Sequence, residues 1–382
     1  MPTTRRARLG PVLLAVVTPL ASIFGSGFLI IVPALERTIG PWSVIGIAGV
    51  CAVAWVAGTA VRHCVRVVEP AAESGDLDLT SHRIDRTSDA VIVVAYVISV
   101  ALYLRIMAQY LVSYLHQDDS HLAERLVACA AVALIVAVGI TWGFRGLDLM
   151  DRLALGSVLT LVTLLGVTLL WHDIGLAGDG GLPMPPMPES SLGTTLLVLG
   201  GLVITVQGFE TIRYLGSQYD GPTRIWASRL AQAIATVVYV GFVAVATPVM
   251  GLGTSDGPDA TLLDITMRVT PLLTLPLVLA AVLSQLSAAI ADTAAAEGNL
   301  RGLSTWMRRP RPYLISGAAA IALAATVPTF TIVAVASRAF AAYYGLQAVV
   351  ALRTTQGTVR KVGFGLLAAL MVAITALAQP VG

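Results

Sequence analysis

The chain has 382 residues, of which 56% are hydrophobic and only 12% are charged. Its mean hydropathy of +0.82 excludes a soluble globular domain and predicts a polytopic membrane protein. The formal net charge of +2 gives no indication of a nucleic-acid partner.

Eleven hydrophobic segments follow one another along the chain, and most are long enough to cross a bilayer as helices. The sequence therefore predicts an all-α integral membrane protein with about eleven transmembrane helices. The segments cover residues 10–35, 41–66, 88–115, 122–143, 150–172, 192–216, 226–252, 271–300, 312–327, 329–351 and 360–380.

Basic residues gather before the first segment and in every second loop after it. The alternate loops, 117–121, 179–191 and 256–264, are acidic or nearly uncharged. By the positive-inside rule, this predicts a protein of the plasma (inner) membrane with a cytoplasmic N-terminus and an extracellular C-terminus. The basic residues in these regions are Arg5, Arg6, Arg8, Arg62, Arg66, Arg83, Arg86, Arg145, Arg152, Arg224, Arg229, Arg301, Arg308, Arg309, Arg311, Arg353, Arg360 and Lys361.

A Pro- and Gly-rich extracellular connection at residues 175–191 divides five segments from the next five. Two halves with an odd number of spans enter the membrane in opposite orientations, as in transporters built from inverted repeats. We therefore expect a first repeat over residues 1–174, a second over 192–353 and an eleventh span within 354–382.

The first segment contains Gly25, Ser26 and Gly27 near its middle. Glycines weaken a helix, and backbone groups freed at membrane depth are tolerated only where they face a cavity. The segment therefore fits a helix broken around a binding site. A close-packing patch between helices is the alternative.

The sixth segment is interrupted by Thr205, Gln207, Gly208 and Glu210. Polar residues at this depth are costly and usually functional, although side chains that bond a neighbouring helix are an alternative. Broken helices at matching positions of two halves indicate a central binding site, and so a secondary transporter is the leading hypothesis.

These residues also carry a family resemblance. The stretch Ser22–Gly27 resembles the first-helix motif of the amino acid–polyamine–organocation (APC) superfamily permeases. Gly208-Phe-Glu210 is similar to their sixth helix, and residues 287–301 resemble their eighth. The resemblance implies a LeuT-like fold with a 5+5 inverted repeat, broken first and sixth helices and one extra helix.

The resemblance also implies one substrate site between the broken helices. Amides at Gly25, Ser26 and Gly27 would bind a substrate carboxylate, and carbonyls from Ile204 to Gln207 would bind its ammonium group. Tyr103 in the third segment is either a wall of this pocket or a packing residue. The expected substrate-binding residues are Ser22, Ile23, Gly25, Ser26, Gly27, Tyr103, Ile204, Thr205, Gln207 and Gly208.

Coupling to an ion is expected, with no other cofactor. In sodium-coupled relatives, carbonyls of the first helix and hydroxyls of the eighth hold Na⁺, which here implies Ala21, Phe24, Ser284 and Ser287. A proton carried by Glu210 or Asp292 is the alternative, and we favour sodium.

Two arginines also lie inside predicted helices. Arg105 needs a partner or water. Arg338 is expected to pair with Asp292 or Glu210, either as a static link between helices or as a gate that breaks during alternating access.

The predicted function is secondary active transport of an amino acid or a related small zwitterion or amine across the bilayer. The alternative on the same fold is an inorganic cation transporter, for example for K⁺. The five histidines fall at segment ends or in loops, and no GxSxG motif is present, so an intramembrane enzyme is disfavoured. The metal-binding motifs of the divalent-metal branch are also absent. Oligomeric state is left open.

Overall fold

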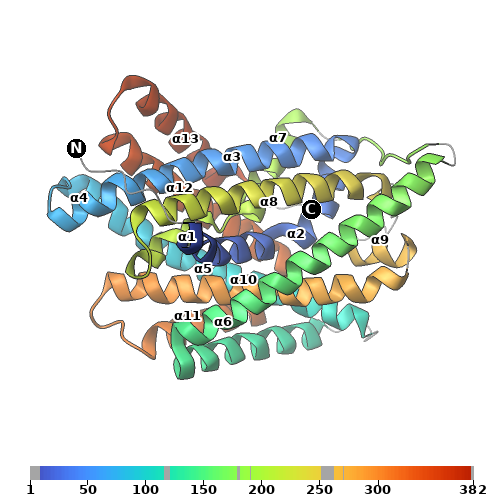
Figure 1. Cartoon of the computed structure of the whole chain (residues 1–382), viewed down its shortest axis with the longest axis horizontal. Coiled ribbons are helices and arrows are strands. Elements are labelled where there is room, and N and C mark those ends of the chain that lie inside the picture. The colour runs from blue at the N-terminus through green and yellow to red at the C-terminus, as the bar shows by residue number, and fades with distance from the viewer. Residues whose placement is uncertain are drawn as a thin grey trace.

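The computed structural model describes residues 9–115, 121–178, 181–189, 191–250, 262–269 and 271–379 (Figure 1). All the regular structure of these residues is helical, which confirms the predicted fold class. Arg5, Arg6 and Arg8 lie outside the described residues, as do residues 117–120 and 256–261 of the loops used to predict orientation.

The first part of the chain, up to the Pro- and Gly-rich connection, forms six α-helices and two short segments of other helical type. They are α1 Leu9–Ala15, α2 Val17–Ile39, η1 Gly40–Trp42, α3 Ser43–His63, η2 Cys64–Val68, α4 Glu69–Ser74, α5 Leu79–Tyr114 and α6 His121–Gly178.

The second part begins with a short helix that continues into two 3-10 segments. Its elements are α7 Leu192–Gly201, η3 Leu202–Val206, η4 Phe209–Ser217, α8 Gly221–Met250, α9 Leu262–Val269, η5 Pro271–Leu273, α10 Thr274–Leu303, α11 Arg311–Thr326, α12 Thr329–Thr354 and α13 Thr358–Leu377.

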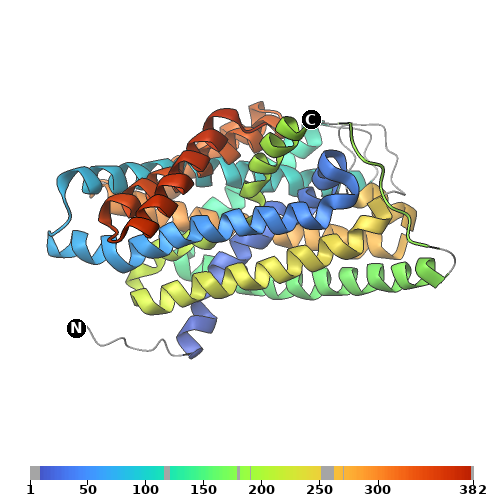
Figure 2. The same ribbon diagram turned by 90° about the horizontal axis from the view of Figure 1, so that it is seen from above.

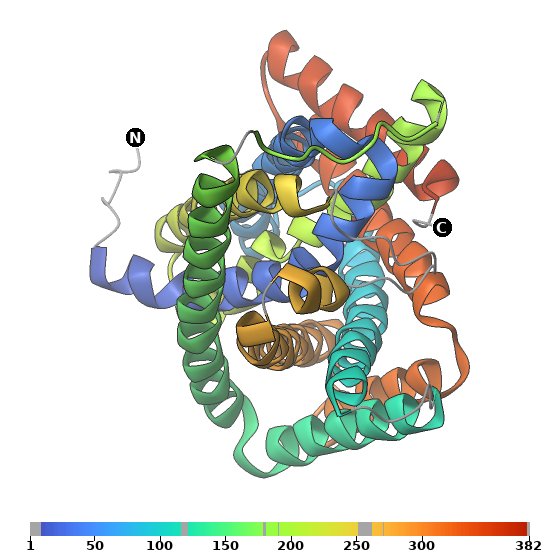
Figure 3. The same ribbon diagram turned by 90° about the vertical axis from the view of Figure 1, so that its right-hand side faces the viewer.

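Each of the eleven predicted segments coincides with helical structure among the described residues, and eight stretches are long and apolar enough to cross a membrane. The fourth and fifth segments are the two arms of α6. They meet at Gly143, whose φ of 64° and ψ of −156° suit glycine and break the helical path. Figure 3 shows the two arms at a steep angle along the outside of the bundle.

The helices divide into a buried centre and a periphery. In the most apolar stretch of α5, 78% of the residues are buried, against 22% in α13 and under 30% in both arms of α6. The centre is formed by α5, α10 and α2, which pack against one another, while α13 packs on α12. In a membrane protein, the exposed apolar faces of α6 and α13 suit contact with lipid.

The break predicted at Gly25–Gly27 is not present, because α2 is helical from Val17 to Ile39. The two glycines instead allow close packing. A Cβ atom on Gly25 would lie 1.7 Å from Cβ of Ala288 in α10, and one on Gly27 would lie 2.1 Å from Cβ of Thr205 in η3. The alternative interpretation of these glycines, a packing patch between helices, matches the structure.

The sixth segment is broken as predicted. It passes from α7 through η3, leaves helical structure at Gln207 and Gly208, and resumes in η4. Gly208 has a φ of 125°, a conformation that other residues rarely adopt.

Candidate functional site

The carboxylate of Asp292 on α10 joins three helices at the centre of the bundle. Its Oδ1 accepts a hydrogen bond of 2.7 Å from Ser22 Oγ on α2, and its Oδ2 accepts one from Ser99 Oγ on α5. The Tyr103 hydroxyl also interacts with this carboxylate. Asp292, Ser22 and Ser99 are fully buried, so the carboxylate is solvated by protein hydroxyls alone among the described residues.

The break in the sixth segment lies directly against α2. A Cβ on Gly208 would meet the Ile23 amide nitrogen at 2.6 Å and Ser22 Cβ at 2.8 Å, so only glycine fits here. The Tyr239 hydroxyl, on α8, lies 2.8 Å from the Ile23 carbonyl oxygen and 3.0 Å from that of Thr205. The first and sixth segments therefore meet at one place, as the sequence predicts.

Two side chains beside this break extend the polar network. Gln207 donates through Nε2 to the Tyr103 hydroxyl. Glu210 accepts from the Tyr344 hydroxyl at 2.8 Å, from the Gly208 amide at 2.9 Å and from the Tyr96 hydroxyl at 3.4 Å. The central polar network thus contains two buried carboxylates, Asp292 and Glu210.

The central polar network is closed to solvent. Its side chains are at most 2% exposed, and cavities beside Tyr96 and beside Ile23 hold only about 10 Å³ each, about the space of one water molecule. Gln207 Oε1 and Gln285 Oε1 are buried acceptors with no hydrogen-bond partner among the described residues. Helices must therefore separate before a solute can reach these groups.

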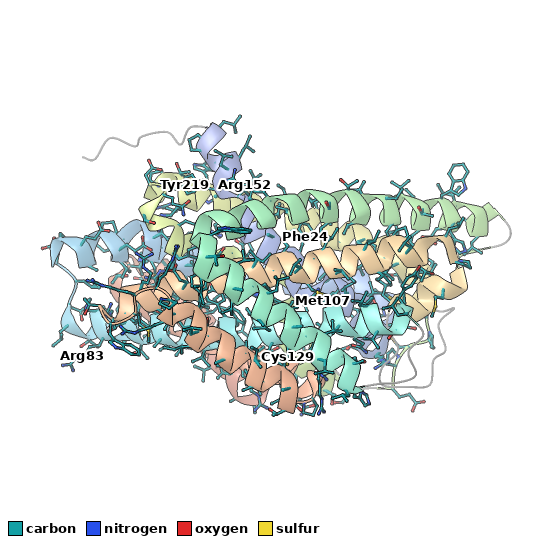
Figure 4. All side chains as sticks on the ribbon, turned by 90° about the horizontal axis from the view of Figure 1, so that it is seen from below. Phe24, Arg83, Met107, Cys129, Arg152 and Tyr219 are labelled. Carbon is teal, nitrogen blue, oxygen red and sulfur yellow. The ribbon has the colours of Figure 1, made fainter. Side chains whose placement is uncertain are left out.

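The predicted ion-coupling residues are brought together in part. Gln285 Nε2 on α10 donates 2.7 Å to the Gly25 carbonyl, and Ser284 Oγ donates 3.1 Å to Ala281 O in its own helix. Ala21, Phe24 and Ser287 are buried on α2 and α10, two helices that pack against each other. Phe24 stacks on Tyr239 and lies midway along the bundle (Figure 4).

The predicted amide cradle for a substrate carboxylate is not formed. A continuous helix uses the amides of Gly25, Ser26 and Gly27 for its own hydrogen bonds to preceding carbonyls. The side chains of Ser26 and Ile204 lie outside the described residues.

The two arginines singled out within the predicted helices have other partners. Arg338 Nη2 donates 3.2 Å to the Ala378 carbonyl, so neither of its predicted pairs, with Asp292 or with Glu210, occurs among the described residues. Arg105 donates to Thr329 Oγ1 at 3.3 Å, and its Nη1 has no partner there.

A second cluster, the ionic cluster, lies where η4 meets the ends of α4 and α5. Arg213 on η4 donates to both Asp85 oxygens at 3.0 and 3.1 Å and lies within 3.5 Å of Asp89 and Glu69. Arg224 on α8 contacts Glu69 at 2.6 Å. The ionic cluster therefore joins η4 to α4 and α5, and α4 to α8.

Sequence reasoning missed several of these residues, namely Ser99, Tyr239, Gln285, Tyr344 and Arg213. A signal existed for Ser99, because Tyr96, Ser99 and Tyr103 are spaced by three and four residues and so share one helix face. The partners of Arg213 are more than a hundred residues away, and no local pattern connects them.

This arrangement, a helical bundle with a broken helix against a second helix at a buried polar centre, is similar in fold to LeuT-fold transporters. The structure of Mhp1, a nucleobase-cation-symport-1 family transporter with bromovinylhydantoin bound, matches with a TM-score of 0.54 and 13% identity, over 100% of this chain and 94% of that chain. Two structures of an Eremococcus coleocola manganese transporter match with TM-scores of 0.57 and 0.58 at 12% and 13% identity, each over at least 96% of this chain and 87% of that chain. Such low identities show the fold alone.

The chain belongs to the APC superfamily of transporters, since the family model described as "APC superfamily transporter" matches residues 5–378. An uncharacterized protein of Aquifex aeolicus (strain VF5) is 33% identical over 358 residues, covering 92% of this chain and 85% of that protein. The protein is therefore a multi-pass membrane transporter, and transporters of this kind are not enzymes.

Proposed function

We propose that the protein is a secondary active transporter for an amino acid or related small amine, and that the solute's positive group is bound at Asp292. The supporting observation is the position of this carboxylate, fully buried between Ser22 of α2 and Ser99 of α5, beside the break at Gly208. A buried charge is costly unless it is paired, and an ammonium group is a suitable counterion for the Asp292 carboxylate.

Alternating access follows from the closed centre. A solute can enter only when helices around the central polar network separate, and the ionic cluster is positioned to hold η4 against α4 and α5 until they do. By the arginine distribution, this end faces the cytoplasm of the plasma membrane, with the C-terminus outside.

Coupling to Na⁺ or H⁺ belongs to the same proposal. Na⁺ would bind between α2 and α10 at the carbonyls of Ala21 and Phe24 and the hydroxyls of Ser284 and Ser287. A proton would be carried by Glu210, or by Asp292 in exchange for the solute's positive group.

An inorganic cation such as K⁺ is the second candidate, and one observation favours it. Two buried carboxylates, Asp292 and Glu210, and two unpartnered carboxamide oxygens, on Gln207 and Gln285, lie in and beside the central polar network. Hard cations prefer oxygen ligands of this kind. The missing amide cradle also removes the expected binding site for the carboxylate of a zwitterion.

The test is a thermal-shift screen of the purified protein with amino acids, amines and K⁺, each with and without Na⁺, followed by uptake into proteoliposomes. A ligand that binds the folded state raises its melting temperature. We expect an amine-bearing solute to stabilise the protein and Asp292→Asn to weaken its binding by about 30-fold or more, the typical effect of truncating one partner of a buried charge pair. Asp173→Asn, on the second arm of α6 and outside the central polar network, is the matched control.

Two results separate the candidates. Stabilisation by K⁺ alone, lost in Glu210→Gln, contradicts the amine proposal and supports the cation transporter. Undiminished amine binding in Asp292→Asn shows that this carboxylate does not receive the positive group.

A further inference from the structure

A separate cavity of about 780 Å³ lies on the side of the bundle where α1, α3, α8 and α13 meet. Figures 1 and 2 show α3 and α8 side by side, with α13 next to α3. The cavity contains none of the residues of the central polar network. We call it the basic groove after its five basic side chains, Arg62, His63, Arg66, Arg229 and Arg360.

Each long helix turns one face to the basic groove. On α3, Trp55, Thr59 and Arg62 recur at intervals of four and three residues. The face of α8 is formed by Trp226, Arg229, Leu230 and Ala233, which are spaced by three, one and three residues. The wall is therefore built from regular helix faces and not from loops.

The positive charge of the basic groove is not neutralised by the protein. Among the described residues, no carboxylate lies within ion-pair distance of Arg62, Arg66, Arg229 or Arg360, whereas Arg213 and Arg224 have acidic partners. Arg66 and Arg229 also lie close enough to repel the charge of Arg62. Four guanidinium groups around one cavity favour an anion.

Arg62 is held in place although it has no acidic partner. Its Nη1 donates to Gln232 and, at 3.3 Å, to Ser228, and its Nη2 donates 3.2 Å to the Trp55 carbonyl. Its guanidinium lies 5.1 Å from the centre of the Trp55 ring. It is 4% exposed, so this is a positioned, buried charge at the floor of the groove.

The rest of the wall is apolar. Leu9, Val12, Leu230, Ala233 and Phe364 line it. Arg66 lies just past the end of α3 and Arg360 lies in the first turn of α13, while Trp55 and Phe364 lie further along these helices. Charge at the end and apolar surface deeper in match a molecule with an anionic head and a hydrocarbon tail.

We propose that the basic groove binds an anionic phospholipid, with the phosphate at the arginines and an acyl chain along the apolar wall. The lightly buried face of α13 borders the groove, and therefore a lipid reaches it laterally from the bilayer. A soluble anion would satisfy the arginines but would leave the apolar wall in contact with water.

The test uses purified, delipidated protein and three probes that separate headgroup from chain. Dioctanoyl phosphatidylglycerol and dioctanoyl phosphatidylcholine carry the same chains, and glycerol 3-phosphate carries the anion without chains. We expect phosphatidylglycerol to raise the melting temperature at much lower concentration than phosphatidylcholine, and glycerol 3-phosphate to give no comparable shift.

The test variant and its control each remove two positive charges. Arg66→Gln with Arg360→Gln removes two exposed groove arginines that make no hydrogen bond within the described residues, so folding is preserved. We expect the apparent affinity for phosphatidylglycerol to fall about 30-fold, since each basic residue near an anionic lipid contributes about one kilocalorie per mole. The control, Arg83→Gln with Arg308→Gln, also removes two exposed arginines, but outside the groove; Arg83 is visible at one end of the bundle in Figure 4.

Three outcomes overturn the proposal. The first is an unchanged affinity for phosphatidylglycerol in the groove variant, and the second is an equal loss of this affinity in the control. The third is an equally large rise in melting temperature with glycerol 3-phosphate, which would assign the site to a soluble anion. None of these measurements uses transport, so the result is independent of the proposed function.

Discussion

The two glycine-containing segments predicted to be broken helices behave differently. In the sixth segment, the backbone leaves helical structure at Gln207 and Gly208, and Gly208 takes a φ of 125°. In α2, Gly25 and Gly27 keep helical geometry and allow Ala288 and Thr205 to approach closely. A glycine in a membrane helix can therefore serve either conformation or packing, and its neighbours in space decide which.

The segment after the break depends on ion pairs, while α2 depends on packing. Arg213→Gln removes the basic partner of Asp85 and Asp89 and should lower the free energy of unfolding by about 3–5 kcal/mol, the usual cost of breaking a buried pair. Thermal unfolding in detergent measures this, with exposed Arg83→Gln as control. Equal melting temperatures for the two variants would show that the ionic cluster does not hold η4.

Gly208→Ala tests the broken helix itself. An alanine at this position must adopt a strained φ, and its methyl group crowds Ile23 and Ser22. We therefore expect the free energy of unfolding to fall by about 3 kcal/mol and transport to be lost. Gly357→Ala is the matched control, because Gly357 has a φ of 94° but nothing within 4 Å of the added atom. If both substitutions have the same cost, backbone strain alone is responsible and the contact with α2 is loose.

Gly25→Ala tests the continuous helix. In α2, the added Cβ would overlap Ala288, and we expect a loss of about 2 kcal/mol, typical of overpacking. Gly49→Ala, in α3 with nothing within 4 Å, should be neutral or stabilising by up to about 1 kcal/mol, because alanine favours helix. A stabilising Gly25→Ala would mean that α2 and α10 are farther apart than the structure shows.

The smallest expected effect concerns the start of α5. The Asp78 carboxylate accepts from the amides of Thr80 and Ser81, and hydrogen bonds with Ser81 and the nearby Arg353 lower its pKa to about 2. Because this pKa lies below the usual 3.8, the charged form contributes stability above about pH 4 and loses it as the pH falls toward 2. The difference in melting temperature between the wild type and Asp78→Asn should be present at pH 5 and shrink toward pH 2. A constant difference would exclude the charge as its cause.

The sequence by itself determined the class of the protein and much of its layout. Hydrophobic length predicted the eleven segments, because the bilayer sets the length of a helix that spans it. Polar residues in apolar segments predicted the break at Gln207 and Gly208 and drew attention to Glu210 and Asp292, because such residues inside a membrane span are costly and usually functional.

The tertiary structure alone decided which side chains these residues meet. Ser22, Ser99 and Asp292 come from three helices, and Arg213 meets Asp85 across 128 positions of the chain. The helical geometry of α2 was also decided this way, since local propensity disfavours glycine in a helix by only about 1 kcal/mol each, less than close packing against two neighbouring elements provides. Local conformational preferences can be predicted from the sequence, whereas a contact between distant segments exists only once the chain has folded.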